Sequence, residues 1–364
     1  MAHRTADYVL CEFVKQLGYG DMVEEYEKMD AWFAWYMAKK SIKGNRMKPK
    51  ILVIGDIMLD IFTSGDAHRL SPEAPVPIIL NPETRTSLGG AGNVVVNLCA
   101  LDCDVRLLSC IGDDDAGNQI REKLSRIKSC IDINLIVAKD HVTTTKQRFI
   151  ANGQSVVRVD NESLFDIFPD IRCTNLTHQM PISYLNRMIE ASDAIVVSDY
   201  GKGFITETFM AHVIASAGLN KIIVVDPKGK NTWKYAGASI ITPNTKEAFD
   251  LTGELDPYKA GPVLQKRLPG AEVIITCGSS GMLLFSGGRV ELFQGHNVNV
   301  SDMTGAGDTV VAVVAALKAM GTSTSEAARL ANLAGSLVVS KHGTACVNWE
   351  DLSVPLGDAN AKHS

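Results

Sequence analysis

The stretch DMTGAGDTVVAVVAAL, from Asp302 to Leu317, decides how this 364-residue chain is interpreted. It begins with a short polar segment, passes through the residues GAGD at 305–308, and continues as an uninterrupted run of small apolar residues typical of a buried helix. Small residues let backbone N–H groups approach a ligand closely, and a helix start supplies unpaired donors and the positive end of the helix dipole. The stretch therefore predicts an anion-binding site at the start of a helix.

Asp308, the last residue of this turn, has two interpretations. A carboxylate beside a bound phosphate can act as the general base for a hydroxyl group that approaches the phosphate. The same carboxylate can equally be an N-terminal cap that only stabilises the helix. The stretch alone does not distinguish a general base from a helix cap, so the motifs in the rest of the sequence are needed to choose between them.

Apolar runs and amphipathic stretches alternate along the chain from residue 51 onwards. Runs that are apolar throughout are typical of parallel strands buried on both faces of a sheet. We expect strands at 51–54, 105–110, 194–198, 222–225, 239–242, 273–276 and 282–285. We expect helices at 91–101, 116–129, 180–191, 206–218, 245–252, 259–268, 307–319 and 325–341. This alternation predicts an α/β fold with a doubly wound, mostly parallel sheet flanked by helices.

Two segments break the pattern and are typical of strands with one face in water. The first, 61–80, contains RLSPEAPVPI, whose prolines suit an edge strand or a lid hairpin. The second, 142–160, carries Lys146 and Arg148 two residues apart, so both side chains should lie on one face of a strand. Together the segments predict a small β lid, built from two insertions, over the mouth of the large sheet.

The first 48 residues differ in character from the rest, with aromatic and methionine residues at helical spacing followed by a basic stretch. We interpret residues 1–48 as a helical N-terminal extension and linker, because such stripes usually pack against another surface. The main domain is expected over residues 49–353, and residues 354–364 are expected to be a C-terminal tail.

The charge balance excludes several kinds of partner. The formal net charge is −5, which argues against broad electrostatic binding to nucleic acid or to an anionic membrane. No run approaches about 18 uninterrupted apolar residues, and the N-terminus lacks the pattern of a secretory signal. We therefore expect a soluble, cytoplasmic protein that holds any anion locally.

A second glycine-rich turn, GGAGNVVVNL, also opens a predicted helix. Gly89 and Gly90 permit positive φ and close approach, and Asn93 offers a donor and an acceptor to sugar hydroxyls. Taken alone, this turn fits a helix packing contact as well as a ligand site. The sequence contains neither G-x-x-x-x-G-K-[ST] nor G-x-G-x-x-G, which argues against a P-loop ATPase and an NAD-dependent dehydrogenase.

Polar residues follow several of the predicted strands at the point where each ends. GDIMLD places Asp56 and Asp60 after the first strand, where carboxylates can accept hydrogen bonds from polyol hydroxyls, and SDYGKG, DPKG and TPNTKE follow later strands. Ligands of open α/β sheets bind at the carboxyl ends of strands, so these ends point to one site. Alternatively, Asn244 and Glu247 form a simple capping box and Lys202 is a solvated surface lysine.

The chain resembles the ribokinase or PfkB family of sugar kinases in eight motifs that occur in order: GDIMLD, RLSPEAPVPI, GGAGNV, TTTKQR, SDYGKG, DPKG, TPNTKE and DMTGAGD. RLSPEAPVPI and SDYGKG favour the heptose 7-phosphate kinases within that family. The resemblance implies a ribokinase-like fold and an ATP-dependent phosphotransferase acting on O1 of D-glycero-β-D-manno-heptose 7-phosphate, a step of ADP-heptose biosynthesis. It covers residues 50–350, and the chain resembles the kinase half alone, without a nucleotidyl-transfer domain.

The resemblance also implies roles for the residues of the glycine turn. Asp308 matches the family's catalytic base, which accepts the proton of the sugar hydroxyl. Gly305, Ala306 and Gly307 match the anion hole, whose backbone donors stabilise charge on the transferring phosphoryl group.

Further residues match the family's nucleotide and metal site. The resemblance places Asn244 and Glu247 in an N-x-x-E motif that organises Mg²⁺ and the ATP phosphates, with Glu247 acting through water because Mg²⁺ keeps several waters. The residues implied to bind the nucleotide are Asn244, Thr245, Lys246, Glu247, Gly278, Gly281 and Asn332.

The sugar site is implied by the remaining motifs. The residues implied to hold sugar hydroxyls are Asp60, Gly89, Gly90 and Asn93. The cations implied to meet the 7-phosphate are Lys146, Arg148 and Lys202, since cations on one strand face form a compact anion clamp.

Departures from the pattern leave alternatives open. Ile61 stands where a basic residue is expected in the heptose kinases, which allows another kinase of this fold, acting on fructose, fructose phosphate or a nucleoside. A catalytically silent sugar-binding protein is the second alternative, although the intact residues 305–308 argue against it. Apolar lid residues, Val76, Ile78 and Ile79, predict a homodimer joined lid to lid.

Overall fold

The computed structural model describes residues 48–138, 141–163, 175–177, 180–341 and 345–353. The chain divides into two units, one formed by residues 1–48 and 348–364 and the other by residues 49–347. The described part of the first unit contains the short 3-10 helix η4, Asp351–Ser353. The extension predicted for residues 1–48, except Lys48, and the tail predicted for 354–364 lie outside the described residues. The following paragraphs describe the second unit.

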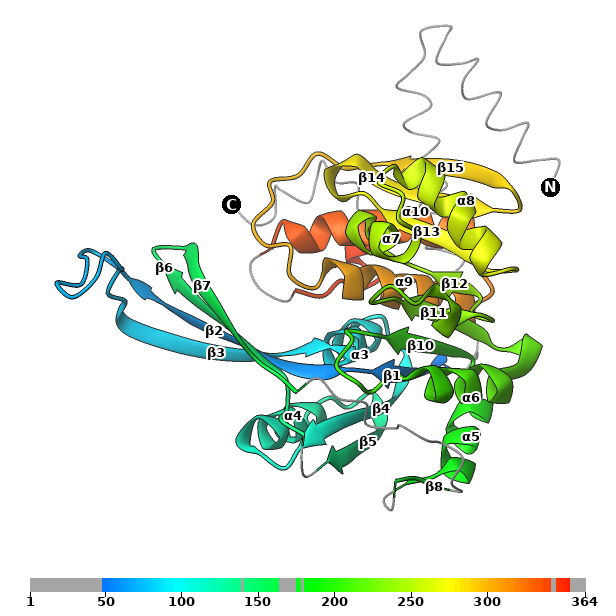
Figure 1. The fold of residues 1–364 in the computed structure, drawn as a ribbon, viewed down its shortest axis with the longest axis horizontal. Coiled ribbons are helices and arrows are strands. Elements are labelled where there is room, and N and C mark those ends of the chain that lie inside the picture. Colours follow the sequence, from blue (N-terminus) through cyan, green and yellow to red (C-terminus); the bar gives the residue numbers. More distant parts are fainter. Residues whose placement is uncertain (1–47, 139–140, 164–174, 178–179, 342–344, 354–364) are drawn as a thin grey trace, which may run out of the picture. The chain divides into compact units, whose positions relative to one another are not determined.

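A nine-stranded sheet forms the centre of this unit (Figure 1). Its strands lie in the order β15-β14-β13-β12-β11-β10-β1-β4-β5. Their bounds are β1 Lys50–Gly55, β4 Asp104–Gly112, β5 Cys130–Ala138, β10 Ala194–Ser198, β11 Ile222–Asp226, β12 Ile240–Ile241, β13 Glu272–Thr276, β14 Gly281–Ser286 and β15 Arg289–Gln294. The strands from β13 to β5 pair in parallel, and β14 and β15 add an antiparallel edge.

Helices cover both faces of the sheet, as predicted for a doubly wound fold. Their bounds are α3 Ala91–Ala100, α4 Asp115–Ser125, α5 Ile182–Glu190, α6 Glu207–Ala217, α7 Thr245–Thr252, α8 Pro257–Arg267, α9 Ala306–Ala319 and α10 Thr324–Val339. Helices α5 to α8 share one apolar core with the central strands, whereas α3, α9 and α10 pack together on the opposite face. Because α9 is buried from Asp308 to Leu317, its small residues are explained by close packing on three sides.

Short elements complete the unit. They are the two-stranded ribbon of β8 Asn175–Thr177 and β9 Met180–Pro181, and the 3-10 helices η1 Gly218–Asn220, η2 Thr232–Tyr235 and η3 Gly278–Ser280.

A second sheet of four strands forms the predicted lid, which projects as an arm from the large sheet in Figure 1. Its strands are β2 Ile57–Asp66, β3 Leu80–Gly90, β6 Thr145–Ala151 and β7 Gln154–Asn161, in the order β3-β2-β6-β7. The sheet expected from two insertions is present, but the first insertion is longer than the predicted 61–80, and the role of this sheet as a lid stays a prediction. Of the two structures predicted for RLSPEAPVPI, the lid hairpin is present and the edge strand is not: the segment is the connection of the β2–β3 hairpin, because proline lacks the N–H that a strand ladder needs.

The sequence pattern missed five strands: the short β8 and β9, and the longer β3, β5 and β15, which were missed for related reasons. Strands β5 and β15 lie at the two edges of the large sheet and are largely accessible along their length, so neither reads as a continuous apolar run. Strand β3 begins with polar, exposed residues and ends at Gly90, where the sequence indicated only a turn. The remaining predicted strands and helices are present, with ends shifted by a few residues at most.

Two glycines inside helices predict opposite responses to the same substitution. A Cβ on Gly261 of α8 would lie 2.3 Å from the buried Phe285 ring, whereas a Cβ on Gly335 of α10 would meet its nearest neighbour, Val310, at 3.5 Å. We expect Gly261→Ala to lower the free energy of unfolding by about 1–3 kcal/mol through overpacking. Gly335→Ala should be neutral or stabilising by up to about 1 kcal/mol, because alanine favours the helix. Chemical denaturation measures both effects, and equal midpoints for the two variants would contradict this account.

Candidate active site

The carboxyl ends of neighbouring strands bring the predicted site residues together. Asp56 follows β1, Ser198 ends β10 and Asp226 ends β11, and these three strands are adjacent in the sheet. After β1 the chain continues to β4 on one side, and it later returns through β10 on the other side. This change of direction is the topological switch point at which open α/β sheets bind ligands.

Asp308 lies buried at the first turn of α9, with 3% of its surface exposed. Its Oδ2 accepts a hydrogen bond from Asn93 Nδ2 at 2.8 Å, and its Oδ1 accepts one from the Tyr200 hydroxyl at 2.9 Å. The N-cap of α9 is Gly305, at φ 82°, and no side chain caps this helix. Asp308 is therefore not a helix cap. Burial raises the pKa of Asp308 to about 6, even though both hydrogen bonds lower it.

Asn93 connects Asp308 to helix α3. The side chain of Asn97 donates to the Asn93 carbonyl at 2.9 Å, and the Thr309 hydroxyl donates to Asn97 Oδ1 at 3.0 Å. These bonds join α3 to α9 in the protein interior, which fixes the Asn93 amide relative to Asp308. The sequence placed Asn93 among the sugar ligands. In the structure its amide nitrogen also donates a hydrogen bond to the Asp308 carboxylate.

The Asp56 carboxylate is bound by the turn that follows β10. Its carboxylate accepts backbone N–H groups of Tyr200 at 2.7 Å, Lys202 at 3.2 Å and Phe204 at 3.3 Å. Burial, and then the neighbouring Asp199, raise its pKa to about 6. The prediction that Asp56 accepts polyol hydroxyls stays a prediction, and the structure shows that its buried carboxylate already accepts three backbone N–H groups of the turn that follows β10.

The lid places its charged residues close to this turn. Asp60, which is buried on β2, forms an ion pair with Arg148 at 2.7 Å, so both residues lie on one lid face. The Lys146 ammonium lies 5.0 Å from the centre of the Tyr200 ring, and burial lowers its pKa. Lys202 forms an ion pair with Glu162 at 2.5 Å, so it is not a freely solvated lysine.

Glycines at the junction of β3 and α3 allow the close approach that the sequence suggested. A Cβ on Gly89 would lie 2.3 Å from Asp60 Oδ2, and a Cβ on Gly90 would lie 2.4 Å from the Asp56 carbonyl oxygen. Gly90 also has a φ of 56°, which side chains rarely adopt. Both positions thus require glycine for packing around Asp56 and Asp60.

The predicted N-x-x-E residues form a capping box at the start of α7. Asn244 Oδ1 accepts the backbone N–H of Glu247 at 2.9 Å, and Glu247 Oε2 accepts that of Asn244 at 3.0 Å. Glu247 Oε1 also accepts a hydrogen bond from Lys228 at 2.9 Å. Burial, and then the Glu247 and Asp308 carboxylates, raise the pKa of Asp226 well above its usual value. Within the described ranges, no three His, Cys, Asp or Glu side chains are grouped to hold a metal directly.

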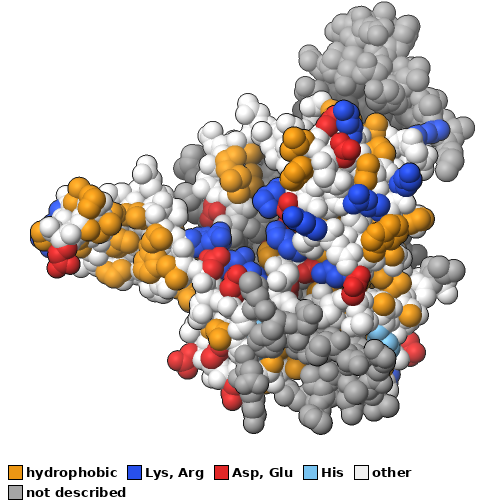
Figure 2. Space-filling view, in the orientation of Figure 1, with side chains coloured by type: hydrophobic (Ala, Val, Ile, Leu, Met, Phe, Trp, Pro, Cys, Tyr) orange, Lys and Arg blue, Asp and Glu red, His pale blue; other side chains and the backbone are white. Residues whose placement is uncertain are grey.

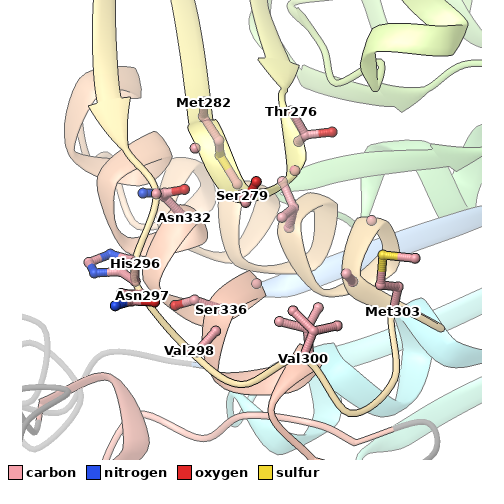
Figure 3. Close-up of a pocket in the computed structure, with 18 residues that line it drawn as sticks. Thr276, Ser279, Met282, His296, Asn297, Val298, Val300, Met303, Asn332 and Ser336 are labelled. Atoms are coloured by element: carbon pink, nitrogen blue, oxygen red, sulfur yellow. The ribbon is translucent and has the colours of Figure 1, made fainter.

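A pocket of about 380 Å³ opens beside the start of α9 (Figure 3). Ala306 and Gly307 line it, so it reaches the predicted anion hole. The predicted nucleotide residues Gly278, Gly281 and Asn332 also line it, and Asn332 Nδ2 donates to the Gln294 carbonyl at 2.7 Å. The sequence missed the wall formed by residues 295–300, which joins β15 to α9 and carries no motif. The capping-box residues 244–247 lie outside this lining.

The comparison with protein families accords with this geometry. Residues 48–351 match the family described as pfkB family carbohydrate kinase. The chain belongs to the PfkB family of carbohydrate kinases. The resemblance seen in the sequence and the enzyme class, a phosphotransferase with an alcohol group as acceptor, are both confirmed. Among the residues that the structure describes, no helix is long and apolar enough to cross a membrane.

Curated relatives of this PfkB-family chain share one name. The chain is 40% identical over 314 residues to "Bifunctional protein HldE" of Geobacter sulfurreducens, and the match covers 84% of this chain and 62% of that protein. It is 37% identical over 313 residues to the protein of the same name from Paramagnetospirillum magneticum, covering 84% and 63%. The chain thus spans about three fifths of the length of these relatives.

Solved structures confirm the ribokinase-like fold. The ribokinase of Arabidopsis thaliana, complexed with ribose and ATP, superposes with a TM-score of 0.65 at 19% identity, covering 84% of this chain and 98% of that one. Phosphofructokinase-2 of Escherichia coli, in complex with substrates and products, gives a TM-score of 0.65 at 18% identity, covering 84% and 97%. At these identities the likeness concerns the fold, and the roles of single residues stay predictions.

Gly305 and Gly321 flank helix α9 at almost the same backbone angle, with φ of 82° and 83°. A Cβ on Gly305 would lie 2.4 Å from Asn93 Nδ2, whereas one on Gly321 would meet no atom of the described residues within 4 Å. Both alanine variants should therefore lose about 1 kcal/mol of stability to backbone strain. Only Gly305→Ala should also lower kcat/KM for sugar phosphorylation, by roughly 100-fold, because it displaces the partner of Asp308. Thermal unfolding measures the loss of stability, and steady-state kinetics measures the loss of activity. Equal activity of the two variants would refute the prediction.

Proposed function

We propose that this PfkB-family kinase transfers the γ-phosphoryl group of ATP to O1 of D-glycero-β-D-manno-heptose 7-phosphate. The observation that carries the proposal is the buried Asp308 carboxylate at the glycine-lined start of α9, beside the 380 Å³ pocket and near the charged lid residues. The motifs RLSPEAPVPI and SDYGKG, and relatives at up to 40% identity with one common name, support the heptose as substrate.

The chemistry requires a base, an acceptor oxygen and a stabilised phosphoryl group. Asp308 takes the proton of the sugar O1–H as O1 bonds to the γ-phosphorus. The bond from that phosphorus to the bridging oxygen of ATP breaks, and ADP leaves with the electron pair. A pKa of about 6 leaves Asp308 ionised at neutral pH and close to the range in which a general base works best.

The phosphates are proposed to lie at the start of α9. Gly305 is the N-cap of α9, and Ala306 and Gly307 are its first residues and line the pocket, so the positive end of the helix dipole lies at the pocket. The adenine is proposed to lie against Gly278, Gly281 and Asn332, in the apolar part of the pocket.

Glu247 and Asn244 are proposed to organise Mg²⁺ through water, with Thr245 and Lys246 beside them. Each Glu247 oxygen already accepts one hydrogen bond and keeps further acceptor capacity for a water molecule. Asp226 adds a third oxygen-bearing group near Glu247, so this donor set suits a hard cation that keeps its waters. When bound, Mg²⁺ supplies charge neutralisation on the transferring phosphates.

The sugar is proposed to lie under the lid. Asp60, Gly89, Gly90 and Asn93 would meet its hydroxyls, and Figure 2 shows Lys and Arg side chains gathered where the lid arm joins the body. Among the described residues, Lys146 forms no ion pair, whereas Arg148 is paired with Asp60 and Lys202 with Glu162. Lys146 is therefore the cation most available to the 7-phosphate, with Lys202 and Arg148 beside it.

A homodimer joined through the lid stays a prediction and forms part of this proposal. Val76 is exposed, whereas Ile78 and Ile79 are half-buried, so those two contribute less than predicted. Val156, Val157 and Val159 of β7 are exposed instead, and hydrophobic side chains spread over the arm in Figure 2.

A panel of sugars with an ADP-release assay tests the proposed activity. We expect turnover with the heptose 7-phosphate to exceed that with fructose, fructose phosphate and nucleosides. Asp308→Asn should lower kcat by about 10²–10⁴-fold, because the base is lost while the shape is kept. Asp115→Asn is the matched control, since Asp115 is the exposed acidic residue in the first turn of α4. Full activity of Asp308→Asn would refute the mechanism, and binding without turnover of any sugar would favour the silent protein.

Comparison of phosphorylated and unphosphorylated sugar tests the anion clamp. Lys146→Ala should raise KM for the heptose 7-phosphate by roughly tenfold or more, since a charge-assisted contact contributes about 1.5–3 kcal/mol. The same variant should change KM for the unphosphorylated heptose much less, because that sugar has no group for the ammonium. An equal rise for both sugars would place Lys146 outside the phosphate site.

A further inference from the structure

The Asp308 carboxylate is held by one donor on each of its oxygens. Asn93 Nδ2 donates to Oδ2 at 2.8 Å, and the Tyr200 hydroxyl donates to Oδ1 at 2.9 Å. An ionised carboxylate can accept about four hydrogen bonds, so each oxygen keeps a lone pair. Two donors that come from separate segments define the plane of the carboxylate and leave the remaining lone pairs for a ligand.

Tyr200 is itself fixed from three directions. Its backbone N–H donates to Asp56 Oδ2 at 2.7 Å, which ties it to the end of β1. Its ring faces the Lys146 ammonium of the lid at 5.0 Å. A Cβ on Gly90 would lie 3.4 Å from ring atom Cδ2, so the junction of β3 and α3 packs against the ring as well. These contacts fix the position of the Tyr200 ring. Its hydroxyl therefore lies where it can donate to Asp308 without a change of rotamer.

We propose that Tyr200 is a positioning residue for Asp308, whose hydroxyl, together with the Asn93 amide, orients the carboxylate toward the acceptor hydroxyl of the sugar. This inference rests on the proposed role of Asp308 as the base. Tyr200 acts through Asp308, and it takes no proton in the reaction.

The hydroxyl also favours the charged form of Asp308. Burial raises the pKa of Asp308, and the hydrogen bonds from Asn93 and Tyr200 oppose that rise. Among the charges around it, Asp60 raises this pKa and Lys146 lowers it. The other titratable groups around Asp308 and Tyr200 are Asp56, whose carboxylate accepts the Tyr200 backbone N–H, Asp226, at the end of β11, and Glu247, on α7. Without the Tyr200 hydroxyl, one of the two hydrogen bonds that lower the pKa of Asp308 is lost while burial still raises it. The pKa of Asp308 should therefore rise further.

Tyr200→Phe removes the hydroxyl and keeps the ring. The acidic limb of the kcat/KM profile, expected near pH 6 in the natural chain, should move upward by about one pH unit. The plateau of kcat should also fall, while KM for ATP should stay unchanged. Tyr235→Phe is the matched control, because the Tyr235 hydroxyl bonds to the buried Asp199 at 2.7 Å and to the Lys228 backbone, and within the described part of the chain no hydrogen bond joins it to Asp308. That control should leave the limb in place.

A second measurement does not depend on turnover. The pKa of the Asp308 carboxyl can be read from ¹³C NMR of aspartate-labelled protein, with the resonance assigned through Asp308→Asn. It should rise by a similar amount in Tyr200→Phe and not in Tyr235→Phe. An unchanged pKa and an unchanged acidic limb in Tyr200→Phe would overturn the inference.

The two proposals can fail separately. If the natural chain phosphorylates no sugar, the proposed function fails, and the NMR titration still decides the role of Tyr200. If Tyr200→Phe does not fold, 3-fluorotyrosine at position 200 gives the opposite test, because its hydroxyl is a stronger donor. The pKa of Asp308 should then fall, and an unchanged or raised value would overturn the inference.

Discussion

The structure of the site depends on one constraint: a carboxylate, Asp308, is kept in the protein interior, and no cation among the described residues forms an ion pair with it. Burying a charge is costly unless hydrogen bonds replace water, and here an amide and a phenol do so. The two donors lie 215 and 108 residues from Asp308 in the sequence. The fold must therefore hold α3, the turn after β10 and α9 together for the carboxylate to stay ionised at neutral pH after it is buried.

The surrounding architecture follows from this requirement. Small residues along α9 let α3, α10 and the central strands approach it, which brings Asn93 within hydrogen-bonding distance. After β1, the Asp56 carboxylate accepts hydrogen bonds from three backbone N–H groups. These bonds fix the shape of the turn that carries Tyr200. A buried acidic residue at the end of one strand thus serves the ligand site through a neighbouring loop. Such indirect support is common where a site is assembled from several strand ends.

The lid adds charged side chains to those that already stand at the strand ends of the large sheet. Asp60 and Lys146 approach the strand ends from β2 and β6, and they influence the pKa of Asp308 in opposite directions. Arg148 binds Asp60, so part of the positive charge of the lid is already neutralised within the lid itself. Charge balance at the mouth of the site is consequently set by the lid as well as by the strand ends.

Local sequence patterns determined the order of helices and strands, the lid and the glycine turn before Asp308. Apolar runs, helical spacing and proline positions depend on neighbouring residues, so they can be recognised without coordinates. Edge strands β5 and β15 were not predicted, because one or both of their faces meet solvent and their sequences mix polar with apolar residues. The family was also recognisable, since its motifs lie at strand ends in a fixed order.

Only the tertiary structure decided which of these residues act on one another. The sequence left Asp308 as either a base or a cap, and the two donors on its oxygens excluded the cap. It offered Asp56 as a sugar ligand and gave no role to Tyr200, whereas the fold joins the two and directs Tyr200 to Asp308. A hydrogen bond between residues more than a hundred positions apart leaves no local pattern, because it arises only when segments distant in the sequence meet in the folded chain.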